Sequence, residues 1–460
     1  MQQPEHSEEV AEVLEEITPE QWQVIRAAIA AQDALALKTA LEPVHPADIA
    51  DLLEQLDADQ RATFLRLYAS EFEGDILSEI DESIREEVID VLPPDVLAEA
   101  VRELDSDDLV DILEDLEHPA REFILDSLES EDRAAVQSAM SWPENSAGRL
   151  MQVETVTAPE SFSVGEMIDY LRSAEELPDQ FYHIILVDPE GHPTGYVTLG
   201  RMLASRRDVL LKDITEESFR TVKASEDEEE VAHLFNKYHL ISMPVVDESG
   251  LLVGVITIDD AMNVLDEEHE EDILRLAGVS EESSLSDRIL DTTRGRFVWL
   301  FVNLLTAILA SYVISMFQDE INALVALAVL MPIVASMGGN AGTQSMTVAV
   351  RALATRELTG KNARRVLWRE VVVGMLNGAA FGIIMSLVAA FWFGVPMLAV
   401  VIAIAMMLTL AAAAFAGIVL PLALDRMGVD PALASGPFVT TVTDVVGFFA
   451  FLGLAALIVL

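Results

Sequence analysis

The 460-residue sequence contains no cysteine and few basic residues. The first absence excludes a disulfide framework and any thiolate metal site or nucleophile. The second is uneven, because residues 1–290 contain 70 Asp and Glu against 19 Lys and Arg, whereas residues 291–460 contain 8 against 9. An acidic half of this kind repels phosphate, so a nucleic-acid partner is excluded for it. The N-terminus also lacks a basic segment and an apolar run, which predicts no cleavable signal peptide and a cytosolic acidic half.

Charged residues are missing from long stretches of the second half. Residues 371–424 hold 54 consecutive positions without Asp, Glu, Lys or Arg. A helix of that length would run about 80 Å against a hydrocarbon core of roughly 30 Å, so the chain must turn back. The expected turn is at 394–396. We predict a transmembrane domain at 297–460 with five helical spans, at 297–317, 321–355, 371–393, 397–422 and 431–460.

The connections between these spans alternate between basic and non-basic. Arginines precede the first span, six Lys or Arg residues lie between 351 and 369, and Arg426 precedes the last span. The 318–320 and 394–396 connections and the C-terminus contain no Lys or Arg. Because basic loops stay on the cytosolic side, we predict a multi-pass protein of the plasma (inner) membrane, with its N-terminal domains cytoplasmic and its C-terminus outside.

The acidic half divides into three parts. Residues 1–140 carry the degenerate repeat DLLEQLD, EAVRELD and DILEDLE, with helix starts at HPADIA and LPPDVLAEA, which predicts an α-helical superhelix. The segments 181–205 and 239–265 each follow the order strand, turn, strand, helix, with a D-x-x-G turn. This duplication resembles a tandem pair of α/β cystathionine β-synthase (CBS) domains, which we place at 141–210 and 211–265.

Residues 266–296 link the CBS pair to the membrane part. The segment opens with a run of acidic residues that we expect on one helix. A solvated charged linker is the simpler interpretation of such a run. The alternative is that the helix transmits movement, since it joins a sensor-like pair to the membrane.

Asp444 is the only charged residue of the last span. An ionisable residue inside a span is costly and is a functional candidate by default. Thr440 and Thr441 lie four and three positions earlier, so their oxygens share its face. Carboxylate, hydroxyl and carbonyl oxygens suit Mg²⁺ or Ca²⁺ and not the soft transition ions. The alternative is a lone Asp, protonated or paired inside the bundle.

The segment 331–353 of the second span contains Pro332 and the sequence GGNAG. These residues predict a helix loosened at membrane depth, which is tolerated only where protein or a water-filled cavity satisfies the backbone. Asn340, Thr343 and Gln344 would then offer neutral oxygens to a hydrated cation. The alternative is a small-residue motif for helix packing. Glu370, beside Arg369, fits a surface ion pair as well as a pore role.

No hydrolase arrangement, phosphate loop, HExxH or GxGxxG motif occurs, and the eight histidines lack metal-ligand spacing. We therefore expect no enzyme activity. Three segments instead resemble recurring segments of the MgtE magnesium channels, and the domain order is similar over essentially the whole length. They are SWPENSAGRLM (141–151), PIVASMGGNAGTQ (332–344) and DPALASGPFVTTVTD (430–444).

The resemblance implies a homodimer in the lipid bilayer with a Mg²⁺-selective pore on its two-fold axis. The spans that hold 332–344 and 431–460 would line the pore, and Asp444 would hold the hydrated ion. Further Mg²⁺ sites between the cytosolic domains would close the pore when cytosolic Mg²⁺ is plentiful, with 266–296 as a plug helix. The carboxylates implied for these sites are Asp260, Glu268, Glu271, Asp272 and Asp430, with Asp107 and Asp111 as weaker candidates.

Closure of the pore by Mg²⁺ agrees with the charge of the acidic half, whose carboxylate clusters repel one another unless cations intervene. Cations that bind only the compact arrangement shift the population toward it. Asn263 is neutral where the family pattern is acidic, which puts the ligand count of one site in question. The alternatives are a coupled exchanger, a channel for another divalent ion such as Co²⁺ or Mn²⁺, and a CBS-bearing membrane receptor or scaffold. Whether the CBS pair also binds a nucleotide stays open.

Overall fold

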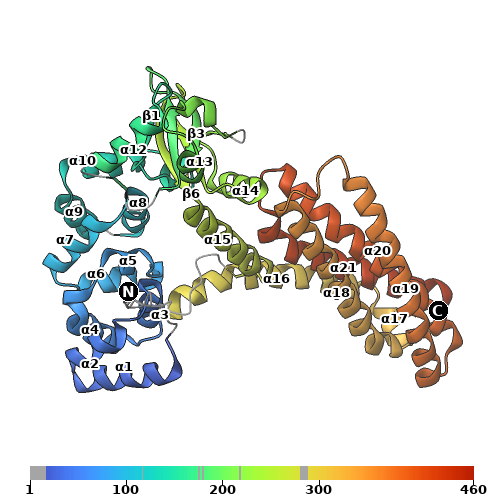
Figure 1. Cartoon of the computed structure of the whole chain (residues 1–460). Coiled ribbons are helices and arrows are strands. Elements are labelled where there is room, and N and C mark those ends of the chain that lie inside the picture. Colours follow the sequence, from blue (N-terminus) through green and yellow to red (C-terminus); the bar gives the residue numbers. More distant parts are fainter. Residues whose placement is uncertain are drawn as a thin grey trace, which may run out of the picture. The chain divides into compact units, whose positions relative to one another are not determined.

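The computed structural model describes residues 17–116, 118–174, 177–178, 181–216, 219–279 and 289–459. The chain separates into two compact units, Met1–Glu267 and Glu268–Leu460 (Figure 1). Most of the acidic residues belong to the first unit, and the long apolar stretches belong to the second.

Short helices fill the start of the first unit. The helices that begin at Pro46 and Pro94 have proline in the first turn, with Asp48 and Asp95 near their positive ends, as the two predicted helix starts require. The helices stack in two rows, α3, α5, α7 and α9 in one and α4, α6, α8 and α10 in the other, over one shared apolar core. The predicted superhelix is thus confirmed. The bounds are α1 (Pro19–Ala31), α2 (Ala34–Leu41), α3 (Pro46–Glu54), α4 (Ala58–Tyr68), η1 (Ala69–Glu71), α5 (Gly74–Ser78), α6 (Glu82–Val91), α7 (Pro94–Glu103), α8 (Ser106–Asp115), α9 (His118–Ser127) and α10 (Ser130–Ala139).

Two three-stranded sheets follow, and both have the same topology. In each sheet the central strand is parallel to the strand before it and antiparallel to the strand after it. This repetition confirms the predicted CBS pair. The strands are β1 (Thr157–Pro159), β2 (His183–Val187) and β3 (Pro193–Thr198), then β4 (Val222–Lys223), β5 (Ser242–Val246) and β6 (Leu252–Thr257). The accompanying helices are α11 (Ala147–Leu150), α12 (Val164–Ser173), α13 (Leu199–Ala204), η2 (Leu211–Ile214), α14 (Glu228–Tyr238) and α15 (Ile258–Leu276).

The two D-x-x-G turns have one geometry. Oδ1 of Asp188 accepts hydrogen bonds from the backbone N–H groups two and four residues later, at 3.0 and 2.8 Å. Oδ1 of Asp247 accepts the equivalent pair at 2.8 and 2.9 Å. Gly191 and Gly250 end the turns with φ of 94° and 87°, a region that side-chain-bearing residues rarely adopt. A hydrogen bond between the side chains of His183 and Ser242, the first residues of β2 and β5, joins the two copies.

Helix α15 runs from the second CBS copy into the linking segment without a break. It starts after β6 and ends at Leu276, followed by Gly278 in the left-handed region with φ of 73°. The boundary that we place at residue 265 therefore falls inside one helix, while the other domain boundaries stay predictions. The acidic run 266–272 lies on this helix, as expected. The linking segment continues through residues 280–288, which lie outside the described residues.

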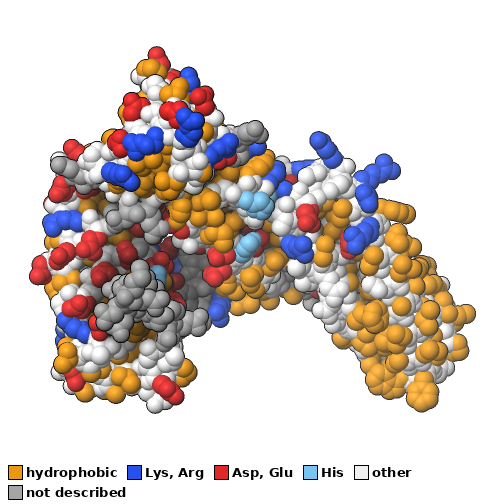
Figure 2. All heavy atoms as spheres, in the orientation of Figure 1, with side chains coloured by type: hydrophobic (Ala, Val, Ile, Leu, Met, Phe, Trp, Pro, Cys, Tyr) orange, Lys and Arg blue, Asp and Glu red, His pale blue; other side chains and the backbone are white. Residues whose placement is uncertain are grey.

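Within the described residues, five helices are long and apolar enough to cross a membrane, as predicted. Gly394, with φ of 65°, forms the expected turn between the third and fourth. The fourth is the most buried and packs against three others. Figure 2 shows basic side chains toward one end of this unit and hydrophobic side chains gathered toward the other, which agrees with the alternating connections. The helices are α16 (Ile289–Ser315), the short α17 (Gln318–Ala323), α18 (Ala326–Ala354), α19 (Ala363–Phe393), α20 (Pro396–Arg426) and α21 (Pro431–Ile458).

The expectation of a loosened helix at GGNAG is wrong. Helix α18 continues through Pro332 and through the whole glycine-rich sequence. The glycines instead allow close packing: a Cβ on Gly338 would lie 2.7 Å from Thr409 Cγ2, and a Cβ on Gly342 would lie 2.6 Å from Val439 Cγ1. The alternative, a small-residue packing motif, is therefore the one that the structure supports.

Candidate functional site

Asp444 lies in the middle of α21 and is half-buried. The hydroxyl of Thr441 donates to the carbonyl oxygen of Pro437 at 2.6 Å, and that of Thr440 donates to Gly436 at 3.0 Å. Each hydroxyl has therefore used its hydrogen on the helix backbone, and its oxygen is left as an acceptor. The face that carries Asp444 thus offers oxygen lone pairs, as a hard cation requires.

The close packing at Gly338 and Gly342 brings α18 against α21. The opposite face of α18 is exposed in the single chain, and Asn340, Thr343 and Gln344 lie on it. Among the hydrogen bonds of the described residues, none joins these side chains to Asp444. The structure thus places two polar faces on neighbouring helices without closing them into a site within one chain.

Glu370 lies in α19 and is half-buried. Its Oε2 accepts a hydrogen bond of 3.4 Å from the hydroxyl of Ser345, a buried residue of α18. No ion pair with Arg369 occurs among the described residues. Of the two interpretations of Glu370, the structure gives the surface ion pair no support, and a pore role stays a prediction.

Carboxylates of α8 and α15 come together in the first unit. Burial, the charge of Asp260 and the neighbouring Asp108 raise the pKa of Asp107 well above its usual range. Burial and the same Asp260 charge raise the pKa of Asp108 to about 7. Burial also raises the pKa of Asp260 to about 6, although Thr257 donates to it at 2.6 Å. These three half-buried groups therefore repel one another, and a bound cation would relieve that repulsion.

Two further carboxylates of the first unit were missed from the sequence. Asp108 is one, and its pairing with Asp260 depends on two helices distant in the chain. Glu228 of α14 is the other, because burial and the charge of Glu267 raise its pKa to about 7. Asp111, by contrast, forms an ion pair of 2.9 Å with the buried Arg85, which gives it a structural partner.

The end of α15, which belongs to the second unit, carries a second group of charges. Arg275 Nη2 lies 2.8 Å from Glu271 Oε2, and Arg275 Nη1 lies 2.7 Å from Asp430 Oδ2. Burial, followed by the charge of Asp430, raises the pKa of Asp272, which lies on the same helix. Glu268, Glu271, Asp272 and Asp430 are all half-buried.

Among the described residues, no three Asp, Glu or His side chains converge tightly enough to hold a metal ion. A Mg²⁺ ion usually keeps several waters and binds through only one or two carboxylates, so it does not need such a group. The structure thus offers carboxylates in pairs and triplets that repel one another, and no preformed cage. The ligand roles of the predicted residues stay predictions.

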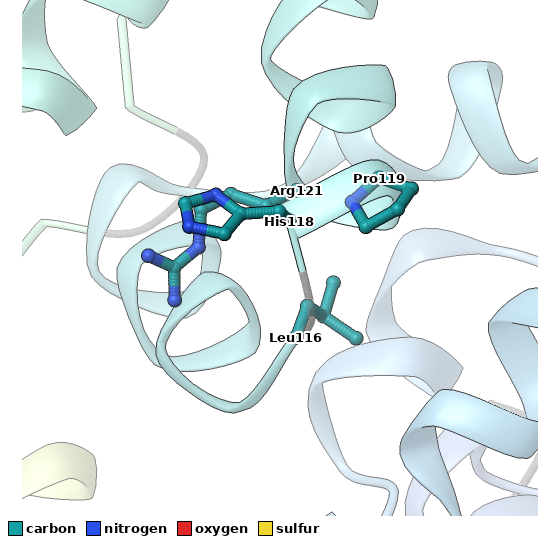
Figure 3. Close-up of a pocket in the computed structure, with 4 residues that line it drawn as sticks. All are labelled: Leu116, His118, Pro119 and Arg121. Carbon is teal, nitrogen blue, oxygen red and sulfur yellow. The ribbon is translucent and has the colours of Figure 1, made fainter.

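A cavity of about 290 Å³ lies where α8 meets α9 (Figure 3). Its lining consists of Leu116, His118, Pro119 and Arg121. The described residues of this lining are two apolar and two basic or imidazole side chains. A second cleft lies between the CBS copies and is lined by Phe181, Tyr182, His183, Thr257 and seven others: Gln152, Glu154, Thr155, Val156, Ile185, Ser242 and Val255.

The chain is similar to known proteins over most of its length. The MgtE family described as divalent cation transporters matches residues 331–454, the MgtE intracellular N domain matches 44–145, and the CBS domain matches 211–267. The magnesium transporter MgtE of Thermus thermophilus is 34% identical over 440 residues, covering 93% of this chain and 96% of its own. The chain belongs to the MgtE family. The Bacillus subtilis MgtE, 29% identical over 91% of this chain and 93% of its own, is a second relative.

A solved structure that is similar to this MgtE member is the cytosolic domain of the Mg²⁺ channel MgtE in complex with ATP. It is 32% identical, with a TM-score of 0.49, and covers 53% of this chain and 99% of its own. The two matched MgtE segments contain Asp107, Asp108 and Asp444, and the matched CBS segment contains Asp260. The end of α15, with Arg275, lies between the matched segments.

Proposed function

We propose that this MgtE member is a Mg²⁺-selective channel that works as a homodimer and is closed by cytosolic Mg²⁺. Membership of a divalent cation transporter family supports Mg²⁺ transport, and the relatives are named magnesium transporters. The observation that carries the proposal is Asp444, the only charge of the last membrane span, on a face of acceptor oxygens. A water-lined path is the environment in which such a carboxylate is tolerated.

The exposed polar face of α18 supports the dimer. Asn340, Thr343 and Gln344 would face lipid in a single chain, which is costly for polar side chains. A second copy across a two-fold axis would cover them and would place two Asp444 carboxylates around one path. Two carboxylates in a low-dielectric wall favour a divalent over a monovalent cation, and the ion keeps most of its waters.

Closure by cytosolic Mg²⁺ follows from the carboxylates of the first unit. Asp107, Asp108 and Asp260 are held together at the cost of mutual repulsion, as their raised pKa values indicate. An ion that binds only this compact arrangement stabilises it in proportion to the logarithm of the ion concentration. Rising cytosolic Mg²⁺ would therefore shift the cytosolic domains toward the compact state, which we propose is the closed state. Carboxylates on α15, including Glu268, would add to this response.

Uptake of Mg²⁺ into liposomes by purified protein tests the proposal. A channel should carry Mg²⁺ down its own gradient, at a rate that imposed proton or sodium gradients do not change. Dependence on either gradient would instead indicate a coupled exchanger. Equal uptake of Co²⁺ or Mn²⁺ in competition would contradict Mg²⁺ selectivity, and absence of any flux would favour a membrane receptor or scaffold.

We propose a nucleotide as a second ligand, in the cleft between the CBS copies. The aromatic rings of Phe181 and Tyr182 would stack on a base and the hydroxyl of Thr257 would bond to a ribose, once the cleft, now about 20 Å³, widens to admit them. Calorimetric titration with ATP and AMP, compared with a Thr257→Val variant, tests this ligand. Unchanged affinity in that variant would exclude this cleft.

A further inference from the structure

The end of α15 is attached to the rest of the second unit by two kinds of contact. Leu276 packs against an apolar cluster of α18 and α21 that contains Met346, Val350 and Val439. One residue earlier, the guanidinium of Arg275 bonds to Asp430, the residue that begins α21. An apolar contact and a charged contact thus fix the same turn of the helix.

Arg275 bridges two carboxylates that the resemblance assigns to Mg²⁺. Its two terminal nitrogens lie 2.8 Å from Glu271 and 2.7 Å from Asp430. The second oxygen of Asp430 accepts from the backbone N–H of Ala432 at 2.7 Å, so each oxygen of that carboxylate already has a donor. A planar guanidinium suits this role because it presents paired donors in a fixed geometry.

The side chain of Arg275 is largely buried, with 19% of it exposed, and its partners are about one-third exposed. A charge this shielded from water interacts more strongly than a surface ion pair and exchanges partners less readily. The bridge thus occupies two of the predicted ligands, Glu271 and Asp430.

We infer that Arg275 is a built-in cation that fixes the end of α15 to the start of α21 without Mg²⁺, by occupying carboxylates that a bridging Mg²⁺ would otherwise use. The inference concerns the regulation of the proposed channel and rests on that proposal only for its physiological meaning. It makes the end of α15 a permanent attachment. Mg²⁺-dependent movement then occurs at carboxylates nearer the CBS pair, such as Glu268 and Asp260.

The absence of cysteine allows a clean distance measurement on the full chain. We would place nitroxide labels at Ile273→Cys and Met427→Cys, whose native side chains are 67% and 74% exposed, and measure the distance distribution by pulsed electron resonance in lipid nanodiscs. Singly labelled samples identify distances between copies. In EDTA the parent should give a narrow distribution, because Arg275 holds the helix end without a metal ion.

The Arg275→Gln variant should broaden the distribution roughly two-fold in EDTA, since it leaves the half-buried carboxylates without their counter-charge. Millimolar Mg²⁺, but not an equal ionic strength of KCl, should restore the parent width by bridging the vacated carboxylates. Arg275→Lys keeps the charge but not the paired donors of the guanidinium, so its distribution width should lie between those of the parent and Arg275→Gln. Arg426→Gln removes a charge from the end of α20 and should match the parent.

A broad distribution for the parent in EDTA would overturn the inference, and so would a narrow one for Arg275→Gln. If Mg²⁺ does not reverse the broadening in Arg275→Gln, then Arg275 does not take the place of a bridging cation. The elution volume and circular dichroism of each variant show whether it is folded, and the lysine variant replaces the glutamine variant if the latter is not. Absence of Mg²⁺ flux in liposomes would refute the proposed function while leaving this comparison in EDTA intact.

Discussion

The two units treat their carboxylates in opposite ways. In the first unit, burial raises the pKa values of Asp107, Asp108 and Asp260, and the charge of Asp260 adds to the shift of the other two. In the second unit, the carboxylate of Asp430 is matched by an arginine and a backbone donor. Carboxylates that repel one another without a counter-charge respond to dissolved cations. Carboxylates that are paired with an arginine do not. We therefore expect the group of Asp107, Asp108 and Asp260 to respond to the ion, and the attachment at Asp430 to stay fixed.

The largest effect is expected in the membrane unit. Asp444→Ala should lower Mg²⁺ flux at least about 100-fold, because losing the fixed charge of the pore costs several kcal/mol and each ~1.4 kcal/mol is about tenfold. Asp444→Asn keeps the shape, so an equal loss there would point to charge over packing. Flux into liposomes is the measurement, with chromatography to confirm an intact dimer. Normal flux in the alanine variant would refute the pore assignment.

The next effect concerns the linking helix. Neutralising Glu268, Glu271 and Asp272 together should abolish closure, so that flux persists at Mg²⁺ concentrations that silence the parent. The reason is that Glu268 and Asp272 would bridge through a divalent ion in the closed state, and neutralising Glu271 also removes its ion pair with Arg275. Repulsion between the partly exposed carboxylates is instead screened within about 8 Å at physiological salt. Titration of channel current with Mg²⁺ is the measurement. Closure at the same concentration as the parent would remove this helix from the regulatory sites.

A smaller effect is expected from pH in the first unit. The pKa of Asp108 is raised from 3.8 to about 7 in the compact arrangement, so protonation favours that arrangement. This contribution is full below the pKa of the unfolded state and is lost as pH rises through about 6 to 7, where Asp260 and Asp108 ionise. Without Mg²⁺, lowering the pH through this window should therefore compact the unit, as measured by small-angle scattering or limited proteolysis.

The matched control for this pH effect is Asp108→Asn, which removes the titrating group and should flatten the response. Saturating Mg²⁺ should also suppress it in the parent, because the compact state is then already populated. Compaction of the parent when the pH is raised would contradict the expected direction.

The smallest effect is on stability. Gly342→Ala places a Cβ 2.6 Å from Val439, and overpacking should lower the free energy of unfolding by about 1–3 kcal/mol. The higher helix propensity of alanine offsets up to ~1 kcal/mol of this loss. Gly339→Ala meets nothing within 4 Å and should be neutral or slightly stabilising. Thermal unfolding in detergent compares the two. Equal melting temperatures would show that α18 and α21 do not pack as described.

The sequence predicted those features that repeat or persist along the chain. Helical repeats, the duplicated D-x-x-G turns and five apolar spans all leave a periodic or compositional pattern, and the structure confirms them. GGNAG was misjudged because glycine both weakens a helix and permits close packing, and only the neighbouring Thr409 and Val439 decide between the two.

The pairing of charges left no such pattern. Asp108 and Asp260 are 152 positions apart in the chain, and Arg275 and Asp430 are 155 apart. No local periodicity relates residues at such separations, so these contacts emerge only from the fold. Asp444 was found because a single charge in an apolar span is visible without any knowledge of its neighbours.

The hydrogen bond between His183 and Ser242 has a consequence for symmetry. The two residues occupy equivalent positions, each opening the central strand of its sheet, so the bond lies where the internal repeat meets itself. In a pair of identical chains such a position must hold the same residue twice. When both copies belong to one chain, each can mutate independently. Here the ring nitrogen of His183 faces the hydroxyl of Ser242. The CBS pair is therefore asymmetric where its two copies meet, so its two faces present different chemistry to a ligand.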